Sequence, residues 1–553
     1  MTLPSGNRTS RTLIVILLIA FGLRLALFFL HTGPIENEGA GYTRIAESLY
    51  FRHNYSGIAE NPDLASPPGF PMLIAATAFV TRNFVIAARV VSLLSGLSLV
   101  WSLYLLASRI YGPKTGLLAA LVAAIHPFLA TLSAATYNES PYFAFLFFGL
   151  YWAVRMFDPV PSKAWFWTAF FLGCSFLIRP ESLPIPLLVG LLVFASHGRN
   201  AWRKAVLDSA RMLSVFALFV IPYGLFLRAH TGHFQLEARN LVNYTIGNRI
   251  LDGTSALEAT RGLGENLEFK GPLLHTNIYA SYSPYPAGFK EVVRYFVRMA
   301  LFNRFWLYSD VFPAFAFGAP LLWCLVFLGI FSEPWDRNQL VAQVFLISLL
   351  VYAFVILCAA HSRQLRYAFP LVPLTIVWTA RGLLAIHDWA RNTVQRSFVW
   401  DSFKNWAATL LTSSALLVLV TISALGVRQV AEFSMGSSRY SYIRSAGLWL
   451  KEHEPGRKNI LSEAAVFPFY AGGYQILAPV ASEEVVLRYL HSENPDFIVL
   501  GSSPVKSVSY LRDWYDHGIP DPRAKLIHSE GTGTDRILIY KWDHVSSSQP
   551  ATE

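Results

Sequence analysis

Residues 12–31 read TLIVILLIAFGLRLALFFLH, an apolar run that carries one charged residue, Arg24. A helix needs about 20 mostly apolar residues to cross a bilayer, so this run predicts a membrane-spanning helix. Arg24 within it would snorkel to the interface or pair with a carboxylate. Arg8 and Arg11 precede the run as they would in a signal peptide. No small-residue cleavage site follows before Glu36, however, so we expect a retained helix.

Similar apolar runs recur as far as residue 427 and together predict about eleven spans in a transmembrane domain of residues 1–427. The expected spans are residues 12–31, 84–108, 115–133, 140–157, 164–178, 183–198, 212–229, 311–331, 339–360, 367–386 and 406–427. The chain is 54% hydrophobic and 14% charged, whereas an ordinary soluble protein is about 25% charged. This composition excludes a soluble enzyme, a disordered scaffold and a disulfide-rich secreted module. The three cysteines all lie in apolar runs and form no metal or disulfide pattern.

The net charge of +10 is unevenly distributed along the chain. Residues 1–427 carry 32 basic and 20 acidic side chains, and the remainder carries 13 basic and 15 acidic ones. The excess therefore lies among the spans, where short cytoplasmic loops are expected to be basic. No basic module stands apart from those loops, so we expect no nucleic-acid partner.

The basic residues also predict orientation, because they fall on alternate connections of an eleven-span chain. We therefore expect a multi-pass protein of the bacterial cytoplasmic membrane with the N-terminus inside. Two long connections, residues 32–83 (the first loop) and 230–310 (the second loop), then lie outside. The C-terminal residues 428–545 lie outside too.

The C-terminal residues change in character and predict a small α/β domain. Helical patterns at Tyr440–His453 and Ser482–Glu493 alternate with short apolar strands at Asp496–Gly501 and Arg536–Trp542. Only Ser546–Glu553 are expected to be disordered.

The first loop begins Gly33-Pro-Ile-Glu-Asn-Glu-Gly-Ala-Gly41, which predicts an extended, glycine-rich stretch carrying Glu36 and Glu38. Tyr42–Tyr50 then has the pattern of an amphipathic helix. A carboxylate held at the membrane surface can take a proton from a hydroxyl acceptor, and a solvated acidic loop is the alternative interpretation. Further along, the prolines of Ser66–Pro71 favour a stiff turn, and Met72–Val80 is too short to span.

Ionisable residues at the edges of spans are costly and indicate a site. They gather on the expected outer side, where arginine suits a lipid phosphate because its planar fork donates two parallel hydrogen bonds. The alternative is a set of interfacial anchors that neutralise one another. The candidates for substrate binding are Tyr42, Arg82, Arg89, Glu139, Arg179, Glu181, His361, Arg363, Arg366 and Tyr367.

These motifs together resemble the GT-C superfamily of integral-membrane glycosyltransferases, and most closely bacterial relatives of protein O-mannosyltransferases (PMT type) and of the lipid A aminoarabinose transferase. The resemblance covers nearly the whole chain. It rests on Glu38–Leu49, Pro67–Pro71, Asn138-Glu139, Arg179-Pro-Glu181, and Arg366-Tyr367 with Pro370 and Pro373. In the C-terminal residues it adds Trp449-Leu450, Tyr470–Gly473 and Asp496–Leu500.

The resemblance implies transfer of a sugar from a polyprenyl-phosphate donor to an acceptor outside the cytoplasmic membrane, with inversion. It places the catalytic base on Glu38, four residues before Tyr42, although composition alone does not separate Glu38 from Glu36. Gly39 stands where the aminoarabinose branch has a second acid, and Ala65-Ser66 replace an acid–lysine pair whose lysine contacts phosphate. An arginine must then take over that contact. A divalent cation is possible but not favoured, and no other cofactor is implied.

Two alternatives to the enzyme remain open: a transporter or flippase of lipid-linked sugars, and a non-catalytic relative that binds polyprenyl phosphate. A transporter is expected to show paired interrupted helices in its two halves, whereas here the polar residues gather at one face. The acceptor can be a protein hydroxyl, a lipid or a glycan, and neither it nor the sugar is encoded by a motif.

Overall fold

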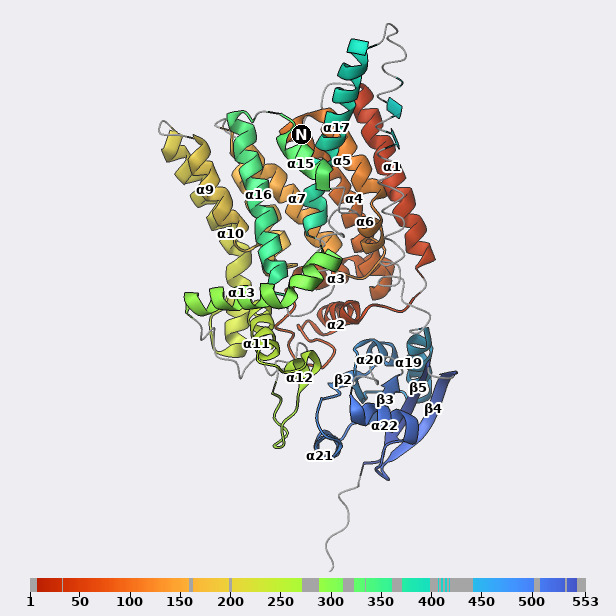
Figure 1. Ribbon diagram of the computed structural model, residues 1–553. Coiled ribbons are helices and arrows are strands. Elements are labelled where there is room, and N and C mark those ends of the chain that lie inside the picture. Colours follow the sequence, from red (N-terminus) through yellow and green to blue (C-terminus); the bar gives the residue numbers. More distant parts are fainter. Residues whose placement is uncertain are drawn as a thin grey trace, which may run out of the picture.

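The computed structural model describes most of the chain as a helical bundle with a small α/β unit at one end (Figure 1). The described residues are 7–31, 33–158, 163–197, 201–270, 288–311, 323–333, 335–360, 370–397, 441–501, 508–532 and 535–544, with isolated positions between 406 and 417.

Helices account for nearly all of the structure as far as residue 397. They are α1 (Asn7–Leu30), α2 (Asn37–Arg52), α3 (Gly69–Thr81), α4 (Phe84–Tyr111), α5 (Pro113–Ile125), α6 (Pro127–Leu132), α7 (Glu139–Met156), α8 (Ala164–Phe176), the 3₁₀ turn η1 (Pro180–Ser182), α9 (Ile185–His197), α10 (Trp202–Thr231), α11 (Arg239–Leu251), α12 (Ala256–Arg261), α13 (Phe289–Trp306), the π turn η4 (Leu307–Val311), α15 (Trp323–Phe331), α16 (Arg337–Cys358) and α17 (Leu371–Ser397).

The expected class, an α-helical polytopic membrane protein, is confirmed. Within the described residues, five helices are long and apolar enough to cross a membrane, namely Arg8–Leu30, Phe84–Tyr111, Pro180–His197, Trp202–Thr231 and Gln339–Cys358. Where they are described, the expected spans from 12–31 to 367–386 fall on helices of the bundle; residues 312–322 of the span 311–331 and residues 367–369 of the span 367–386 lie outside the described residues. The last expected span, 406–427, lies almost wholly outside the described residues.

The expected span 115–133 is not one helix, and this corrects the sequence interpretation. It divides into α5 and α6 at His126-Pro127, because proline lacks the N–H that a continuous helix needs. The last carbonyls of α5 are then without helical partners. Arg24 binds two of them, donating to Ala124 O at 2.9 Å and Ala123 O at 3.2 Å. Arg24 therefore neither snorkels nor pairs with a carboxylate, but is fully buried against the end of α5.

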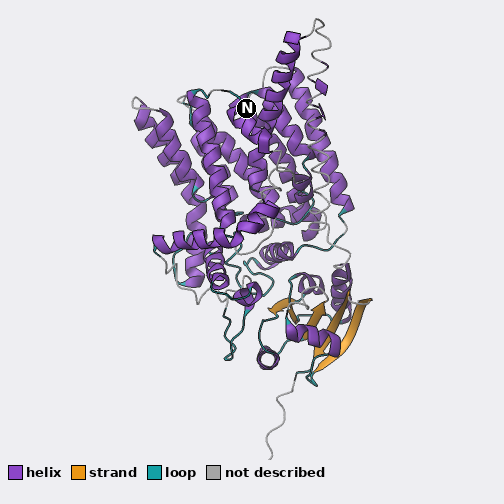
Figure 2. Cartoon of the chain, in the orientation of Figure 1, coloured by secondary structure: helices purple, strands orange, loops and turns teal. Residues whose placement is uncertain are grey.

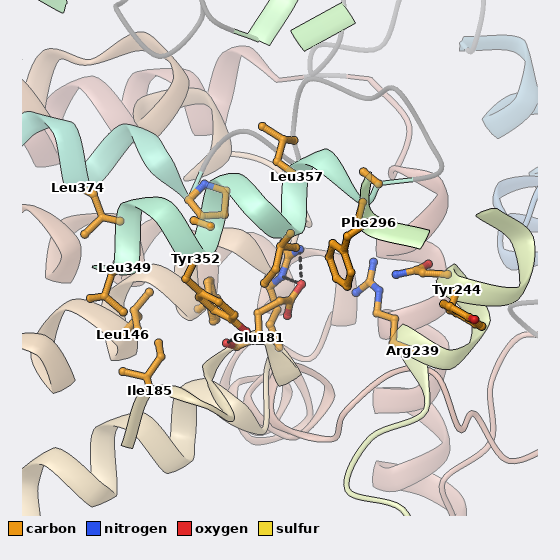
Figure 3. Close-up of a pocket in the computed structure, with 18 of the residues that line it drawn as sticks. Leu146, Glu181, Ile185, Arg239, Tyr244, Phe296, Leu349, Tyr352, Leu357 and Leu374 are labelled. Atoms are coloured by element: carbon orange, nitrogen blue, oxygen red, sulfur yellow. Dashed lines mark hydrogen bonds and ion pairs between the residues drawn. The ribbon is translucent and has the colours of Figure 1, made fainter. Parts of the chain in front are cut away.

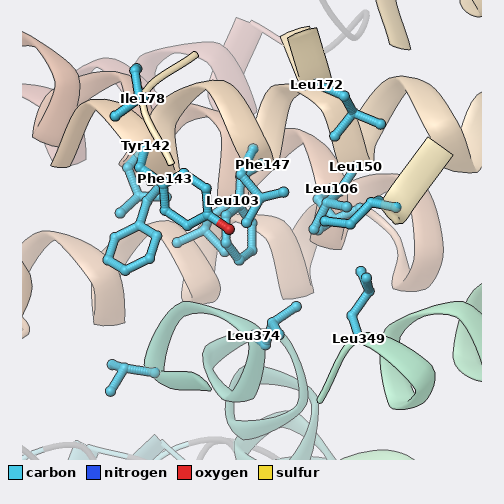
Figure 4. Packing of buried hydrophobic residues seen from close by; sticks show 14 of the residues in the cluster. Leu103, Leu106, Tyr142, Phe143, Phe147, Leu150, Leu172, Ile178, Leu349 and Leu374 are labelled. Atoms are coloured by element: carbon cyan, nitrogen blue, oxygen red, sulfur yellow. The ribbon is translucent and has the colours of Figure 1, made fainter. Parts of the chain in front are cut away.

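The helices pack through a continuous apolar core, in which α4, α7, α8, α16 and α17 meet (Figure 4). Small residues allow the closest approach, as is typical of helices in a membrane. A β-carbon at Gly329 of α15 would overlap the Trp378 carbonyl of α17, and one at Gly382 of α17 would overlap the Leu325 carbonyl of α15. The two glycines therefore let these helices lie against each other at two places.

The two loops form helices at one end of the bundle, which we call the loop end (Figure 1). Helices α2, α3, α11, α12 and α13 all lie there, and the N-terminus lies at the opposite end. Helix α13 runs across the bundle with Val297, Leu301 and Phe305 exposed along one face, and with Tyr295 and Met299 buried on the other. This pattern is typical of a helix in the membrane interface.

The C-terminal unit, residues 441–544, also lies at the loop end and contains the strands of the sheet (Figure 2). Its elements are α19 (Ser441–His453), β1 (Asn459–Ser462), α20 (Val466–Ala471), β2 (Tyr474–Leu477), α21 (Glu483–Glu493), β3 (Phe497–Gly501), α22 (Ser509–His517), β4 (Ala524–Thr532) and β5 (Asp535–Trp542). The strand order is β2-β1-β3-β5-β4, with β1 parallel to β2 and β3 and the remaining pairs antiparallel.

Alternation along the strands explains why helices cover both faces of this sheet. Phe497 and Val499 pack with α19 and α20 on one face, whereas Ile498 and Leu500 pack with α21 and α22 on the other. The two helices and two strands expected from the sequence here agree with α19, α21, β3 and β5 to within a residue or two. Residues 545–553, which include the expected disordered tail, lie outside the described residues.

Candidate active site

Helix α2 begins five residues earlier than the sequence suggested, and this changes the setting of Glu38. The glycine-rich stretch is extended only as far as Glu36, and Glu38 lies in the first turn of the helix. A carboxylate is favoured there by the positive end of the helix dipole. The helix packs so closely that a β-carbon at Gly39 would overlap the Thr136 side chain. An acidic side chain at position 39, as in the aminoarabinose branch, would therefore require Thr136 to move.

Glu36 and Arg89 hold the start of the first loop against the bundle. The Glu36 carboxylate accepts hydrogen bonds from the Thr136 N–H, at 3.0 Å, and from the Thr136 hydroxyl. His31 Nε2 lies 3.7 Å from the other carboxylate oxygen, Glu36 Oε1. Burial raises the pKa of Glu36, against the opposing effect of the Thr136 hydrogen bonds and Arg89. Arg89 donates to the carbonyls of Ala134 and Phe28, so both residues are engaged in fixing the chain.

Tyr42 lies one helical turn after Glu38 and faces into the bundle. Its hydroxyl accepts a hydrogen bond from Asn138 Nδ2 at 2.9 Å, and its ring packs edge-on against Phe70. Burial raises the pKa of the Tyr42 hydroxyl, and the nearby Glu38 carboxylate raises it further. Tyr42 therefore stays protonated and marks the point where α2 meets α7.

Arg179 is held by two carboxylates in the turn between α8 and α9. It donates from Nη1 to Glu139 Oε1 at 3.0 Å, and from Nη2 and Nε to Glu181 Oε1 at 2.8 and 3.2 Å. Arg179 is 4% exposed and Glu139 is 2% exposed, so the cluster is nearly dry. The second oxygens, Glu139 Oε2 and Glu181 Oε2, are buried and have no hydrogen-bond partner among the described residues. The sequence predicted that these three residues belong to one site, and in the structure their side chains are in contact.

A cavity of about 370 Å³ opens beside this cluster (Figure 3). Glu181 and Arg239 project toward it from η1 and α11, and the aliphatic side chains of α7, α9, α16 and α17 lie at its other side. Tyr352, from α16, donates a hydrogen bond to the Glu181 carbonyl at 2.9 Å. The residues that line it are Tyr142, Leu146, Leu150, Arg179, Glu181, Ile185, Arg239, Asn243, Tyr244, Val292, Tyr295, Phe296, Leu349, Tyr352, Ala353, Ile356, Leu357, Ala359, Ala360, Pro370 and Leu374.

Arg239 is the residue that sequence reasoning missed. It is the first residue of α11, where the helix dipole disfavours a cation. Burial alone would lower the pKa of Arg239, but the Tyr42 hydroxyl and the Glu38 carboxylate outweigh it and raise that pKa. Arg239 therefore links the cavity to the first turn of α2. Only its position in the second loop could have singled it out in the sequence.

The other candidates lie elsewhere or outside the described residues. Arg82 caps the C-terminal end of α3 in a left-handed conformation and is exposed, away from the cavity. His361, Arg363, Arg366 and Tyr367 lie outside the described residues, although Ala360 and Pro370 on either side of them line the cavity. In the part of the chain that the structure describes, no group of three or more His, Cys, Asp or Glu is arranged to hold a metal ion.

Residues 65–224 match the family model described as dolichyl-phosphate-mannose-protein mannosyltransferase, which covers less than a third of the chain. No curated protein sequence matches. Among solved structures, the Archaeoglobus fulgidus oligosaccharyltransferase in its apo form is similar with a TM-score of 0.62 and 13% identity, over 99% of this chain and 76% of that one.

A second similar structure is ArnT from Cupriavidus metallidurans bound to undecaprenyl phosphate, with a TM-score of 0.56 and 14% identity over 97% of this chain and 98% of that one. A third is the archaeal oligosaccharyltransferase AglB from Archaeoglobus fulgidus with an inhibitory peptide and a dolichol-phosphate, with a TM-score of 0.54 and 12% identity over 99% and 75%. The chain therefore has the GT-C fold. The PMT-type resemblance expected from its sequence is confirmed, and the matches support a glycosyltransferase.

Proposed function

We propose that this protein is an inverting glycosyltransferase that moves a sugar from a polyprenyl-phosphate donor to a hydroxyl acceptor at the outer face of the cytoplasmic membrane. The observation that carries the proposal is the arrangement at the loop end. A cavity has an aliphatic side and a cationic, carboxylate-bearing side, and its Arg239 interacts electrostatically with Glu38 in the first turn of α2. An isoprenoid chain and a sugar phosphate need those two surroundings together.

The complexes of ArnT with undecaprenyl phosphate and of AglB with a dolichol-phosphate support a lipid-phosphate ligand for this fold. The aliphatic residues Leu146, Leu349 and Leu374 would contact the first isoprene units. Arg239 would bind the phosphate, because it lines the cavity, whereas the guanidinium of Arg179 already forms ion pairs with Glu139 and Glu181. Arg179, which the sequence placed among the candidates for substrate binding, would then hold the two carboxylates instead of the phosphate.

In the proposed reaction, Glu38 takes the proton from the acceptor hydroxyl as that oxygen forms a bond to the anomeric carbon. The bond from the anomeric carbon to the phosphate oxygen breaks on the opposite face, and its electron pair leaves with the polyprenyl phosphate. The configuration at the anomeric carbon is thereby inverted. The leaving phosphate gains a negative charge, so Arg239 would bind it more strongly in the transition state than in the donor.

The unpaired oxygens of Glu139 and Glu181 have a proposed role toward the sugar. A buried carboxylate oxygen without a hydrogen-bond partner is costly, and a sugar hydroxyl would satisfy it. Glu181 lines the cavity, so its Oε2 is the better placed of the two. Arg179 would then act as a positioning residue that fixes both carboxylates.

Purified protein in lipid nanodiscs tests this function. The donor is a synthetic polyprenyl-phosphate sugar, and the acceptor is an envelope fraction from cells that lack the protein. We expect release of polyprenyl phosphate together with a glycosylated product of inverted anomeric configuration, detected by mass spectrometry and NMR. Donor that binds, or that crosses vesicle bilayers, without cleavage would contradict the proposal and favour a binding protein or a flippase.

A further inference from the structure

One short segment of the C-terminal unit, Glu463–Tyr470, contacts both loops of the bundle. The segment joins β1 to α20 and includes most of that helix. The first loop carries the proposed base Glu38, and the second loop carries Arg239. The segment is thus placed between the two halves of the proposed site.

Its contacts with the first loop flank Glu36 and Glu38. The Ile35 N–H donates to the Tyr470 hydroxyl at 2.8 Å, and the Ala465 N–H donates to Asn37 Oδ1 at 2.7 Å. Ile35 and Ala465 are both buried, in one small apolar cluster that also contains Ala40 of α2. These contacts fix the chain on both sides of Glu36, directly before the turn that bears Glu38.

Its contact with the second loop is a buried ion pair. Arg261 Nη2 donates to Glu463 Oε1 at 2.8 Å, and the two side chains are 7% and 9% exposed. The backbone beside it is paired as well, since Leu263 N–H donates to Val480 O at 3.0 Å and Val480 N–H donates to Arg261 O at 2.9 Å. Arg261 ends α12, which follows α11 after a short turn, so the pair anchors the helix that begins with Arg239.

We infer that the segment Glu463–Tyr470 is a positioning device for the two loops: Tyr470 sets the first loop with Glu38, and Glu463 sets the second loop with Arg239. The inference rests on the proposed function of those two residues. Neither Tyr470 nor Glu463 lines the cavity, so each acts through the loop it binds. The physical requirement is geometric, because a base and a phosphate-binding group carried on separate loops need a common support to stay in register.

The two contacts predict different kinetic defects. Tyr470→Phe removes only the hydroxyl that accepts from Ile35, so the base should be misplaced while the donor still binds; we expect kcat to fall about 10-fold with the donor KM unchanged. Glu463→Gln breaks the ion pair with Arg261 and loosens α11 and α12; we expect the donor KM to rise about 10-fold with a small change in kcat. Exchanging the charges, with R261E and E463R together, should restore the donor KM.

Matched controls lie within the same unit. The Tyr515 hydroxyl accepts from the Arg536 N–H at 3.1 Å, as Tyr470 does from Ile35, so Tyr515→Phe removes the same kind of hydrogen bond away from both loops. Glu454 pairs with Lys541 at 2.7 Å, and Glu454→Gln neutralises an ion pair that touches neither loop. Both controls should keep the wild-type kcat and donor KM.

Hydrogen–deuterium exchange of the full protein in nanodiscs gives a readout that does not depend on activity. Exchange should rise over residues 33–42 in Tyr470→Phe and over residues 239–263 in Glu463→Gln, with unchanged elution from gel filtration as the check on folding. The inference is wrong if both variants keep wild-type kinetics and exchange while Glu38→Gln and Arg239→Gln are impaired. It is also wrong if Tyr515→Phe and Glu454→Gln lose activity to the same extent as Tyr470→Phe and Glu463→Gln. Wild-type turnover in Glu38→Gln and Arg239→Gln would instead overturn the proposed function itself.

Discussion

Replacement of Arg239 separates a phosphate contact from a structural arginine. The Arg239 guanidinium offers a phosphate five N–H donors, and Arg239→Lys keeps a positive charge near Glu38 and Glu181, so this substitution should cost little stability. A phosphate can take two parallel hydrogen bonds from arginine but only a point contact from lysine. Arg239→Lys therefore loses one charge-assisted hydrogen bond, worth about 1.5–3 kcal/mol. That corresponds to a fall of about 10- to 150-fold in kcat/KM for the donor.

The assay is initial-rate transfer in nanodiscs over a range of polyprenyl-phosphate sugar concentrations, with thermal unfolding of each variant as the check on stability. Arg298 of the second loop pairs with Asp252 on the surface, with Arg298 45% exposed, so Arg298→Lys is the matched control and should change little. Wild-type kcat/KM in both Arg239→Lys and Arg239→Gln would refute the assignment of Arg239 to the donor phosphate.

Three further predictions concern the surroundings of the site. Arg179→Gln leaves two buried carboxylates uncompensated and should lower the unfolding free energy by about 3–5 kcal/mol, which unfolding in detergent would measure. Burial raises the pKa of Glu36, so the folded state holds its proton more tightly than the unfolded state and stability is lost as pH rises through that raised pKa. Glu36→Gln should therefore weaken the decline of the unfolding midpoint between acidic and neutral pH. A reporter that is active only in the periplasm should be active when fused after Trp542, and activity of a cytoplasm-only reporter there would reverse the proposed orientation.

The helical bundle could be predicted from the sequence because each helix that crosses lipid needs a long apolar run. Such a run can be recognised without knowing what the helix packs against. Local chemistry also explains the break at Pro127, which a proline inside an expected span could have indicated. The hydrogen-bond partners of Arg24 could not be predicted from the local sequence. These partners are two backbone carbonyls about 100 residues away in the chain, and they can accept from Arg24 only because α5 ends beside them.

The site was only partly predictable for a related reason. Charged residues at the edges of spans are rare, and this singled out Glu139, Arg179 and Glu181 in the sequence. In the structure the three side chains form ion pairs with one another through Arg179. Arg239 lies in a polar loop where arginine is ordinary, and only the approach of α11 to α2 distinguishes it. The start of α2 was misplaced because Gly39 and Gly41 suggest extended chain, whereas packing against Thr136 favours a helix with no side chain at Gly39.

The central claim is that Glu38 removes the acceptor proton, and turnover of Glu38→Gln beside Glu36→Gln at saturating donor tests it most directly. Glutamine keeps the shape of the side chain but cannot take a proton at neutral pH, so Glu38→Gln should turn over about 10²- to 10⁴-fold more slowly. The buried Glu36 carboxylate accepts two hydrogen bonds from Thr136, so Glu36→Gln should cost far less. Both variants should elute from gel filtration as the wild type does. Normal turnover of Glu38→Gln together with loss in Glu36→Gln would contradict the account and assign the base to Glu36.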